Sequence, residues 1–510
     1  SCIVLIVAAV PEGLPTIVAV SLALGMIKLA KENALIKKMI ATETAGAVSV
    51  ICSDKTGTLT QNKMSVISIC SNEFCAKPDK NIKEELLYNF VCNSTAEIVF
   101  SGKKEIKKGS GTECALIEAA IKTLNSTNIN DFRNRFKAVY SEPFDSDKKY
   151  MITCIKVQKK YKVLIKGAPE KILARCNLTN EQRHRILHNM YLHQKKARRI
   201  ICFAHADLNE FNYMPKNLTY DYDGFASLSD PLRPEVKEAV KNCAKAGIKV
   251  KILTGDNMET ACAIARELSL IQSDKEAIDA NELNSLDDEN FLKALNKVSV
   301  ISRSTPIIKL RVVKALKSAG AVVAVTGDGI NDAPAIKRAD IGIAMGISGS
   351  EITKEAADVV LLDDSFATVV KTIAFGRNVY KNLQRFIIFQ LSVNISALLF
   401  ITVCAVIGLP QPFNALQLLW INVIMDGPPA LTLGLTQSGE KLMEMKPVDK
   451  KDSIISVKMM LKILFNGVFI ASILLLQYIF NFLNTKPLEK GSTTFTLFVF
   501  FQLFNAFNSI

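Results

Sequence analysis

The sequence predicts a multidomain membrane protein, in which an α-helical transmembrane bundle carries an α/β domain with an inserted α+β domain. Apolar residues make up 49% of the 510 residues although 22% are charged, and the mean hydropathy is +0.20. This mixture is typical of apolar membrane segments joined to a polar soluble part. In the soluble part, strand patterns that end in Asp-bearing turns alternate with helical patterns, as in parallel α/β sheets.

The net charge of +14 restricts the class of partner. It would suit nucleic-acid binding, but a basic patch interleaved with aromatic residues is absent from the sequence. Lysines near membrane ends and around a nucleotide site are the more economical account. The 12 cysteines are scattered without a CxxC pair or metal-ligand spacing, so we expect them to be reduced, in the cytosol or the membrane.

Both ends of the sequence lie in apolar runs. Ser1 opens directly into such a run with no charged region before it, which argues against a signal peptide. Ile510 lies inside another apolar run. We therefore expect the sequence to be a fragment of a longer chain.

The stretch from Ile51 to Thr60 is the first candidate site. It follows the apolar run 47–50, which predicts a buried strand. Asp54 then lies at the end of a parallel strand, where open α/β sheets bind ligands. Lys55 and Thr56 bring a cation and a hydroxyl to it. The hypothesis is that Asp54 is a nucleophile that accepts a phosphoryl group, and the alternative is a solvated Asp at an ordinary strand end.

Two further strands are predicted to end in Asp-bearing turns. Residues 249–253 precede Asp256, and residues 321–325 precede Asp328 and Asp332. Two carboxylates four residues apart in a Gly-rich turn suit Mg²⁺, which prefers oxygen ligands. Three such turns at one sheet edge favour a phosphate and magnesium site over chance. The GxxxxGK[ST] pattern is absent, so a Walker-type nucleotide site is not supported.

The soluble stretch between these turns holds a second candidate site. Phe144, with nearby lysines, leads into a predicted strand at 152–155, and a second strand at 163–165 runs into Lys166-Gly167-Ala168-Pro169-Glu170. An aromatic ring near lysines and a glycine turn can hold a purine and its phosphates. Core and surface roles are the alternative for each residue. The polar runs at 176–190 and 208–223 are loop-like.

The first apolar segment, residues 1–30, is interrupted by Pro11-Glu12-Gly13-Leu14-Pro15. Prolines free backbone carbonyls in a membrane helix, and such a turn with a carboxylate can form a cation site. A proline kink with Glu12 near the interface is the alternative. Lysines that follow the segment mark a cytosolic exit.

Four further spans are predicted, at 386–409, 413–436, 457–483 and 494–510. Their polar residues that could meet Glu12 are Gln390, Asn394, Asn422 and Asp426. Interhelical hydrogen bonding is the alternative for the Asn and Gln residues. Asp426 is harder to assign to packing, because a buried carboxylate needs a partner.

Four motifs together resemble the signature set of P-type ATPases, in order and spacing, across essentially the whole chain: Asp54 to Thr60, Lys166 to Glu170, Thr254 to Asp256, and Gly327 to Asp332. The Pro11 to Pro15 break with Asn422 and Asp426 is similar to the calcium-pumping branch. Residues Met425 to Ala430 resemble secretory-pathway-type and bacterial calcium pumps.

The resemblance implies a haloacid-dehalogenase-like phosphorylation domain with an inserted α+β nucleotide-binding domain. The expected division is a transmembrane helix with the break at 1–30, the phosphorylation domain at 31–67 and 222–380, the nucleotide-binding domain at 68–221, and four transmembrane helices, the last truncated, at 381–510.

The resemblance also implies residue roles. Asp54 would be phosphorylated by ATP, with the phosphate neutralised and oriented by Thr254, Gly255, Asp256, Arg303 and Lys309. Mg²⁺ would be held by Asp54, Thr56 and Asp328, supported by Asp332 and Asn331. The nucleotide would contact Phe144, Lys149, Lys166 and Arg199, with Glu113 and Met151 as lesser members. Calcium would be bound by Glu12, Asn422 and Asp426 with the carbonyls of Val7, Ala8 and Val10.

The implied function is ATP-driven Ca²⁺ transport across a lipid bilayer through an aspartyl phosphate, with the large soluble domains in the cytosol. Ala397 and Gln502 stand where two-site pumps carry acidic residues, which implies one Ca²⁺ per ATP. The actuator domain with its Thr-Gly-Glu loop, the first three membrane helices and the last two are missing, so we expect the fragment alone to turn over poorly.

Three alternatives to a calcium pump stay open. Transport of Mn²⁺ or another divalent ion is one, because Ca²⁺ and Mn²⁺ both accept oxygen ligands. A phosphatase of the same fold would carry a second Asp two residues after the nucleophile, where this sequence has Thr56. A non-enzymatic membrane scaffold with a decayed site is the third, and the intact Asp54, Asp256 and Asp328 argue against it.

Overall fold

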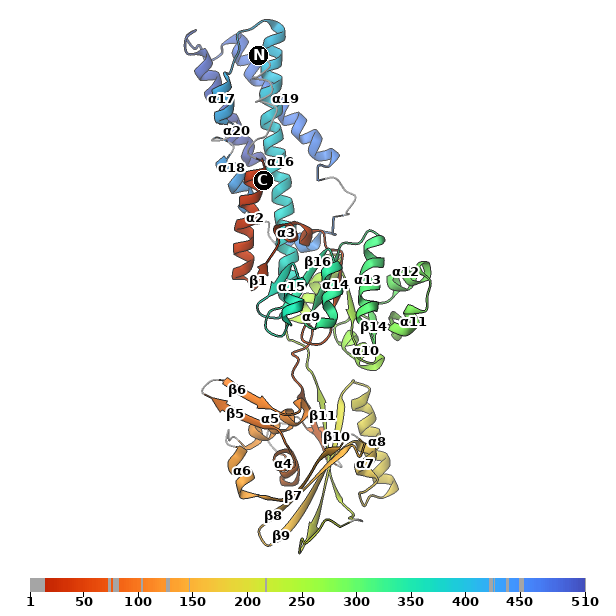
Figure 1. The fold of residues 1–510 in the computed structure, drawn as a ribbon. Helices are drawn as coiled ribbons and strands as arrows, with labels where there is room; N and C mark the ends of the chain where they lie inside the picture. The colour runs from red at the N-terminus through yellow and green to blue at the C-terminus, as the bar shows by residue number, and fades with distance from the viewer. Residues whose placement is uncertain are drawn as a thin grey trace.

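The computed structural model describes residues 14–71, 75–76, 82–101, 104–124, 129–145, 147–215, 218–421, 425, 427–436, 440–448 and 454–509. Figure 1 shows three parts in a row: a group of long helices, a sheet covered by helices in the middle, and a second sheet at the far end. Two chain segments join the two sheets.

The middle part is an eight-stranded sheet. In spatial order its strands are β1 (Ala34–Ile36), β17 (Val359–Leu361), β16 (Ile341–Met345), β15 (Val323–Gly327), β2 (Val50–Ser53), β12 (Lys249–Leu253), β14 (Val300–Ser302) and β13 (Ala277–Asp279). β1 pairs antiparallel with β17, and the other pairs are parallel. The central strands β15 and β2 are buried throughout, because helices cover both faces of the sheet.

Two hydrophobic cores lie on the two faces of this sheet. One contains α3 (Met39–Gly46), α9 (Val236–Lys245) and α10 (Met258–Glu267). The other contains α11 (Ala280–Asn284), α12 (Asp288–Lys297), α13 (Pro306–Ser318) and α14 (Ala333–Arg338). Short elements complete the part: the 3₁₀ turns η1 (Asp274–Glu276) and η2 (Ile330–Asp332), and α15 (Glu351–Ala356).

The predicted strand at 47–50 was placed too early. β2 begins at Val50, because α3 runs to Gly46 and the amide of Val48 still donates to the carbonyl of Ala45. β15 likewise begins at Val323, two residues after the predicted start. The predicted strand 249–253 is confirmed as β12.

The far part is a seven-stranded antiparallel sheet. Its spatial order is β4 (Cys75–Ala76), β3 (Ser65–Cys70), β11 (Asp221–Ser229), β10 (Arg199–Leu208), β9 (Lys160–Gly167), β8 (Tyr150–Val157) and β7 (Ala138–Asp145). One face packs against α4 (Glu84–Val91), α5 (Gly111–Leu124) and α6 (Ile129–Arg135). The other packs against α7 (Pro169–Leu173) and α8 (Asn180–Gln194), and a hairpin of β5 (Glu97–Ser101) and β6 (Lys104–Lys108) lies beside α5.

The polar run at 176–190 is not a loop, because most of it belongs to α8. Thr179 begins this helix with a capping box: its hydroxyl accepts from the amide of Gln182 at 3.2 Å, and the Gln182 side chain accepts from the amide of Thr179 at 3.0 Å. The proposed domain boundaries at 67/68 and 221/222 cut β3 and β11, two neighbouring strands of one sheet. These boundaries stay predictions.

The expectation that all cysteines are reduced was wrong for one pair. Cys70 and Cys75 form a disulfide, whereas the other cysteines that the structure describes are free thiols. The two residues are five apart in sequence, with no recognised spacing. The register of β3 and β4 sets them directly opposite each other, which a sequence pattern does not reveal.

The remaining part consists of helices: α2 (Leu14–Lys31), α16 (Phe366–Ile407), α17 (Ala415–Trp420), α18 (Gly427–Leu435), α19 (Val457–Phe480) and α20 (Lys490–Asn508), with a 3₁₀ turn η4 (Glu440–Glu444). Within the described residues, α16 and α19 are long and apolar enough to cross a membrane. Helix α16 extends for about 63 Å at 1.5 Å per residue. It therefore connects the apolar helices directly to the eight-stranded sheet (Figure 1).

The joint between α3 and α16 depends on two glycines. A Cβ on Gly376 would lie 2.4 Å from the backbone nitrogen of Gly46, and a Cβ on Gly46 would lie 2.7 Å from the carbonyl of Gly376. The two backbones therefore touch, and any side chain at either position would separate them. This contact ties α16 to the segment that leads into β2.

Candidate functional site

Three neighbouring strands bring the predicted Asp-bearing turns together. β2 lies between β15 and β12, so Asp54 follows the central strand, Asp328 one neighbour and Asp256 the other. Because these strands are parallel, their carboxyl ends meet at one edge of the sheet. The predicted clustering of the three turns is confirmed.

Lys309 connects the carboxylates. It lies in the first turn of α13, and its ammonium donates to Asp54 Oδ2 at 3.0 Å and to Asp332 Oδ1 at 2.6 Å. Its side chain is 7% exposed. Such a buried ammonium is held by its two anionic partners, since an unpaired charge would be costly there.

A second ion pair lies on the β12 side of Asp54. Lys55 forms a salt bridge with Asp256, and the amide of Lys55 donates to Asp54 Oδ1 at 2.7 Å. The hydroxyl of Thr254 accepts from the amide of Asp256 at 3.2 Å and shapes this turn. The turn is also tied to the next strand, because the amide of Arg303 donates to the carbonyl of Asp256 at 2.8 Å.

Gly57 lets the Asp54 loop approach the loop after β15. It has φ of +72°, and a Cβ there would lie 2.5 Å from Asp328 Oδ2. Carboxylate oxygens of Asp54, Asp328 and Asp332 consequently lie within 4.8 Å of one another. The amide of Gly329 donates to Asp332 Oδ2 at 3.2 Å, which holds the third carboxylate in position.

The charges at this edge fit a divalent cation. Burial, with Asp54 and Asp332 close by, raises the pKa of Asp328 to about 6. Burial raises the pKa of Asp54 as well, although Lys309 opposes the rise. Three carboxylates thus face one ammonium, so a hard cation with oxygen ligands would relieve the remaining repulsion.

Four predicted residues lie at the rim of this site. Thr56 is half-buried two residues beyond Asp54, and Gly255, Arg303 and Asn331 are exposed. The guanidinium of Arg303 lies 3.8 Å from the carboxylate of Asp279.

A cavity of about 480 Å³ lies on the seven-stranded part. The predicted nucleotide residues that line it are Glu113, Phe144, Lys149, Lys166 and Arg199. Phe144 is 56% exposed, so the face of its ring is free to stack on a planar ligand. Met151 is the exception: it is buried opposite Lys166 in the β8–β9 pair and does not line the cavity.

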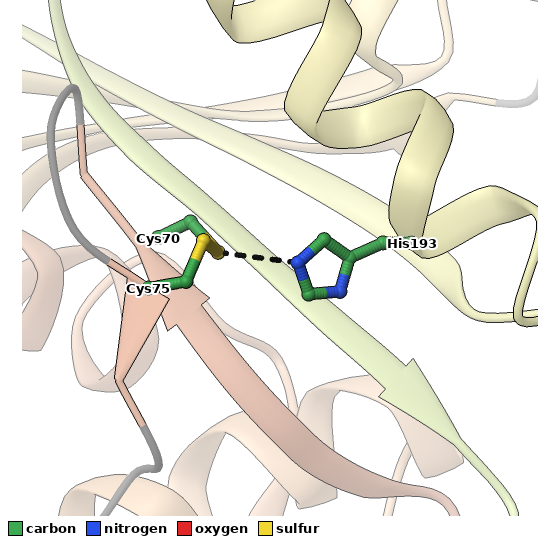
Figure 2. Close-up of side chains that lie close together, drawn as sticks. All are labelled: Cys70, Cys75 and His193. Atoms are coloured by element: carbon green, nitrogen blue, oxygen red, sulfur yellow. Dashed lines mark hydrogen bonds between the residues drawn. A yellow bond between two sulfur atoms is a disulfide. The ribbon is translucent and has the colours of Figure 1, made fainter.

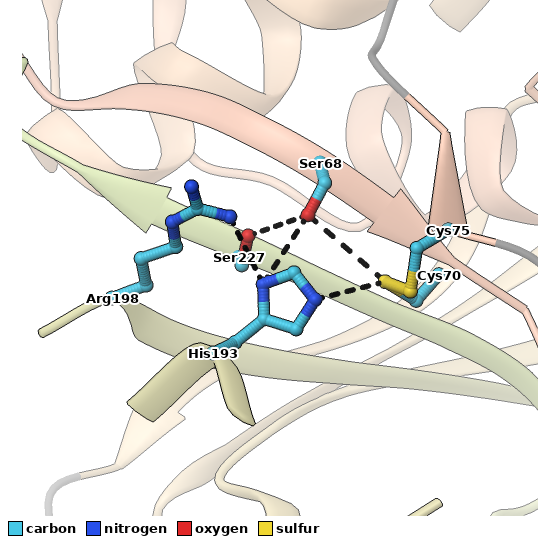
Figure 3. The surroundings of a disulfide bond; sticks show 6 residues. All are labelled: Ser68, Cys70, Cys75, His193, Arg198 and Ser227. Atoms are coloured by element: carbon cyan, nitrogen blue, oxygen red, sulfur yellow. Dashed lines mark hydrogen bonds between the residues drawn. A yellow bond between two sulfur atoms is a disulfide. The ribbon is translucent and has the colours of Figure 1, made fainter. Parts of the chain in front are cut away.

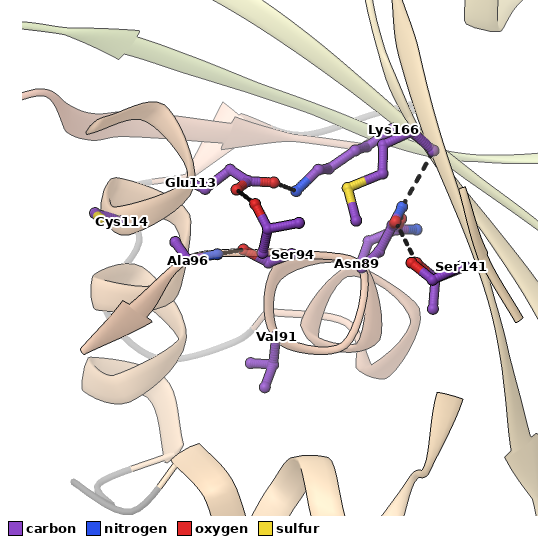
Figure 4. A network of polar contacts seen from close by, with 12 residues as sticks. Asn89, Val91, Ser94, Ala96, Glu113, Cys114, Ser141 and Lys166 are labelled. Carbon is purple, nitrogen blue, oxygen red and sulfur yellow. Dashed lines mark hydrogen bonds and ion pairs between the residues drawn. The ribbon is translucent and has the colours of Figure 1, made fainter. Parts of the chain in front are cut away.

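Lys166 and Glu113 form a buried ion pair at the floor of this cavity. Figure 4 shows the Lys166 ammonium pointing at Glu113, which it meets at 2.6 Å. The hydroxyl of Thr95 donates to the other Glu113 oxygen at 2.7 Å. Burial lowers the pKa of Lys166, and Glu113 only partly offsets this. Burial works against ionisation of Glu113, but Lys166 and Thr95 outweigh it and lower its pKa.

Gly167 is required by the backbone beside it. A Cβ there would lie 2.3 Å from the carbonyl oxygen of Lys149. Lys149 itself adopts a left-handed conformation with φ of +60°. Lys149 and Gly167 therefore allow the β7–β8 turn to pack against the end of β9. This contact closes one side of the cavity.

Sequence reasoning missed several residues of both sites. Thr95 and Thr112 line the cavity, and Thr112 accepts from Arg199 at 3.3 Å. Thr112 adjoins the predicted Glu113, whereas nothing in the sequence marks Thr95. Arg233 was also missed: it donates to the carbonyl of Gly57 at 3.1 Å and supports the Asp54 loop from the chain that returns to the eight-stranded sheet.

A further cavity, of about 690 Å³, lies between the two sheets. Lys55 and Asp256 line one side of it, and Arg198 and Arg199 line the other. Arg199 thus lines this cavity and the one that contains Phe144. The position of Arg199 between two cavities is visible only in the tertiary structure.

The predicted calcium ligands Val7, Ala8, Val10, Glu12, Asn422 and Asp426 lie outside the described residues. The two positions that imply a single calcium site are described. Ala397 is buried in α16, and Gln502 of α20 donates to the hydroxyl of Ser396 at 2.8 Å. This hydrogen bond joins α16 to α20 with neutral groups.

Three family models match separate segments of the chain. Residues 81–235 match the cytoplasmic domain N of P-type ATPases, residues 309–373 match the haloacid dehalogenase-like hydrolases, and residues 410–509 match the C-terminus of cation-transporting ATPases. The first covers most of the seven-stranded part, and the second includes Lys309, Asp328 and Asp332. The chain belongs to the P-type ATPases.

Its similarity within that family is to calcium-transporting ATPases. The chain is 36% identical to calcium-transporting ATPase 1 of Schizosaccharomyces pombe over 98% of this chain and 59% of that protein. It is 36% identical to the human calcium-transporting ATPase type 2C member 2 over 98% and 56%. It is 37% identical to calcium-transporting ATPase 1 of Bacillus cereus over 94% and 55%. The chain thus spans little more than half the length of these curated relatives.

Proposed function

We propose that this chain is the catalytic and part of the transport portion of an ATP-driven Ca²⁺ pump that works through a phosphorylated Asp54. The observation that carries the proposal is the position of Asp54 at the end of the central strand, with Lys309 on one oxygen and Asp328 and Asp256 on the flanking strands. The names of the relatives support the ion and the energy source.

The reaction follows from this geometry. A carboxylate oxygen of Asp54 attacks the γ-phosphorus of ATP, the bond to the bridging oxygen breaks, and ADP leaves with that electron pair. Lys309 neutralises negative charge on the attacking side, and the Lys55 amide orients the carboxylate. Thr254 and the backbone of Gly255 offer donors to the phosphoryl oxygens. Positioning and charge neutralisation account for most of such catalysis.

Mg²⁺ bound by Asp54 and Asp328, with Thr56 beside them, would neutralise phosphate charge during transfer. Asp332 would keep Lys309 and the loop after β15 in place rather than bind the ion directly. Arg303 and Asn331 at the rim would contact outer phosphates.

The adenine would stack on Phe144 in the cavity above Lys166 and Glu113, with Lys149 and Arg199 near the phosphates. Met151 would support Lys166 from below. Because Arg199 also lines the cavity beside Lys55, the triphosphate would extend along this arginine toward Asp54.

Transport would use the helices attached to this catalytic portion. Helix α16 runs from the eight-stranded sheet into the apolar helices, so movement of the sheet would reach the ion path directly. Glu12, Asn422 and Asp426 would bind Ca²⁺ with the carbonyls of Val7, Ala8 and Val10. The neutral Ala397 and Gln502 support one Ca²⁺ per ATP, and the soluble parts would face the cytosol.

Two alternatives have a specific basis. Mn²⁺ accepts the same oxygen ligands as Ca²⁺, so the cation is tested rather than assumed. A phosphatase of this fold would need an acid or base two residues after Asp54. Thr56 cannot fill that role at neutral pH, which favours a phosphoenzyme that persists.

The test is phosphorylation of the full-length chain by γ-labelled ATP with Ca²⁺, with Mn²⁺ or with neither. We expect labelling that requires one of these cations and disappears in Asp54→Asn. The matched control is Asp288→Asn, because Asp288 is 97% exposed and pairs with Arg311 rather than with a residue of the site. Labelling without any transported cation would refute the pump, and labelling of Asp54→Asn would refute the nucleophile.

A further inference from the structure

The disulfide between Cys70 and Cys75 lies next to an imidazole. Figure 2 shows His193, from the end of α8, pointing its ring at the sulfur of Cys70. Its Nε2 lies 3.6 Å from Cys70 Sγ. Cys70 is completely buried, whereas Cys75 at the sheet edge is exposed. The two sulfurs of one bond thus have very different access to solvent.

Arg198 determines where the proton sits on this ring. Its guanidinium donates to His193 Nδ1 at 3.1 Å (Figure 3). A guanidinium can only donate, so Nδ1 accepts and the neutral ring carries its proton on Nε2. The Nε2–H therefore points at Cys70 Sγ. The hydroxyls of Ser68 and Ser227, which share a hydrogen bond at 2.8 Å, close the same pocket.

The surroundings also make Cys75 distinct among the cysteines. It is the exposed cysteine of those that the structure describes, and the free thiols are buried or half-buried. Burial raises the pKa of Cys92, the half-buried one, to about 12. A reagent that needs an accessible sulfur or a thiolate is thereby directed to the Cys70–Cys75 pair.

We propose that Cys70 and Cys75 form a site of reversible thiol–disulfide exchange with small thiols, in which Cys75 is the attacked sulfur and Cys70 the leaving thiolate. The thiolate of a small thiol attacks Cys75 Sγ, the Cys70–Cys75 bond breaks, and its electron pair stays on Cys70 Sγ. The His193 Nε2–H donates to that new thiolate. A lower pKa of the leaving thiol speeds such exchange.

A second thiol completes the reduction. Its thiolate attacks the small-thiol sulfur of the mixed disulfide, a disulfide of the two small thiols departs, and the Cys75 thiolate is released. Two small thiols are oxidised, and their two protons end on the cysteines. In the reverse direction the Cys75 thiolate attacks a small-molecule disulfide, and Cys70 then displaces the bound thiol to close the pair.

This site is placed where it can affect the neighbouring cavities. Arg198 immediately precedes Arg199, which lines the cavity of Phe144 and the cavity beside Lys55. Cys70 is on β3, which pairs with β11, and both strands lead to the segments that join the two sheets.

The test uses the reduced full-length chain and glutathione disulfide, with peptide masses as the readout. We expect the unmodified chain to close the Cys70–Cys75 bond and Cys70→Ser to accumulate a glutathione adduct at Cys75. Cys75→Ser should gain no adduct at Cys70, and the control Cys92→Ser should behave as the unmodified chain. An adduct at other cysteines in Cys70→Ser, or at Cys70 in Cys75→Ser, would overturn the proposal.

The role of His193 has its own readout. With His193→Leu we expect reduction of the disulfide by glutathione to slow about tenfold, because a hydrogen bond to the thiolate is lost. Closure of the Cys70–Cys75 bond from the glutathione adduct at Cys75 should require a higher pH, because Cys70 attacks as its thiolate. His188→Leu, on the exposed face of the same helix, should change neither. Stoichiometric zinc that is lost from Cys70→Ser, Cys75→Ser and His193→Leu would instead identify a metal site and overturn the exchange.

Discussion

The candidate sites on the two sheets differ in how they are built: one is packed with charged groups and the other is an open cavity. At the edge of the eight-stranded parallel sheet, charged groups are packed against one another: Lys309 touches two carboxylates and Lys55 a third. On the seven-stranded antiparallel sheet, a cavity of about 480 Å³ is left open beside a single buried ion pair. The first arrangement suits a reaction in which charge moves, and the second suits recognition of a ligand by its shape.

The difference follows from the type of sheet. Parallel strands that end at one edge bring three loops together, so residues far apart in sequence meet over short distances. In the antiparallel sheet, neighbouring strands end at opposite edges, so the ligand site is formed by a helix, a turn and strand faces. Arg199 lines both the open cavity and the cavity between the sheets, so the two sites share this residue.

The largest loss of stability is expected from removing Lys309, the cation that contacts two carboxylates at the edge of the parallel sheet. Lys309→Gln leaves Asp54 and Asp332 buried without their ammonium, which should destabilise the eight-stranded part by about 3 to 5 kcal/mol. The measurement is urea-dependent alkylation of Cys52, which is buried in β2, compared with that of Cys154 in the other sheet.

Lys314→Gln is the matched control for this change, because Lys314 is exposed on the same helix. The urea midpoint for alkylation of Cys52 in Lys314→Gln should equal that of the unmodified chain. An equal shift of the Cys52 and Cys154 midpoints in Lys309→Gln would contradict the assignment of the effect to one sheet.

The open cavity should be more sensitive to shape than to charge. In Gly167→Ala the new methyl group would overlap the carbonyl of Lys149, and such overpacking costs about 1 to 3 kcal/mol. We expect ATP affinity, measured by calorimetry, to fall about tenfold or more. Phosphorylation by acetyl phosphate, which has no adenosine, should be unchanged.

Gly491→Ala serves as the control for a general glycine effect, since nothing lies within 4 Å of a Cβ at that position. Unchanged ATP affinity in Gly167→Ala would argue against this cavity as the nucleotide site.

A smaller change should be confined to α8. Thr179→Ala removes the hydroxyl that accepts from the amide of Gln182, and loss of such a cap costs about 1 kcal/mol. Hydrogen exchange at the first turn of α8 should accelerate, while the strand ends around Asp54 keep their protection. Faster exchange throughout the seven-stranded sheet would mean that α8 is not a local unit.

The smallest expected effect is that of pH on the stability of the seven-stranded antiparallel sheet. His205 bonds Asp223 at 2.6 Å between β10 and β11. Burial opposes the charge on His205, but Asp223 outweighs it and raises the pKa of the imidazole. Above pH 6.5 the folded state then holds more protons than the unfolded state, so stability should fall as pH rises through the raised pKa.

The urea midpoint for Cys154 alkylation, followed from pH 6.5 upward, measures this effect. His205→Gln should flatten the dependence, whereas His184→Gln, at an exposed position on α8, should leave it in place. A midpoint that rises with pH in the unmodified chain would have the wrong sign for this pair.

Local patterns predicted much of the catalytic edge. The turns with Asp54, Asp256 and Asp328 were recognisable because each follows a strand pattern and contains glycine or hydroxyl residues. The Lys166–Gly167 pair and Phe144 were recognisable for similar reasons, and they line one cavity. Met151 was grouped with them, but it is buried opposite Lys166 and does not line the cavity, which the strand pattern alone does not reveal.

The sequence by itself determined which residues could carry charge at strand ends, because that pattern is local and short. Only the tertiary structure decided which of them touch: that Lys309 bridges Asp54 and Asp332, and that Arg199 faces two cavities. It also decided that Cys70 meets Cys75 and His193. Strand order, register and helix placement set these contacts, and they arise from packing of the whole chain rather than from neighbouring residues.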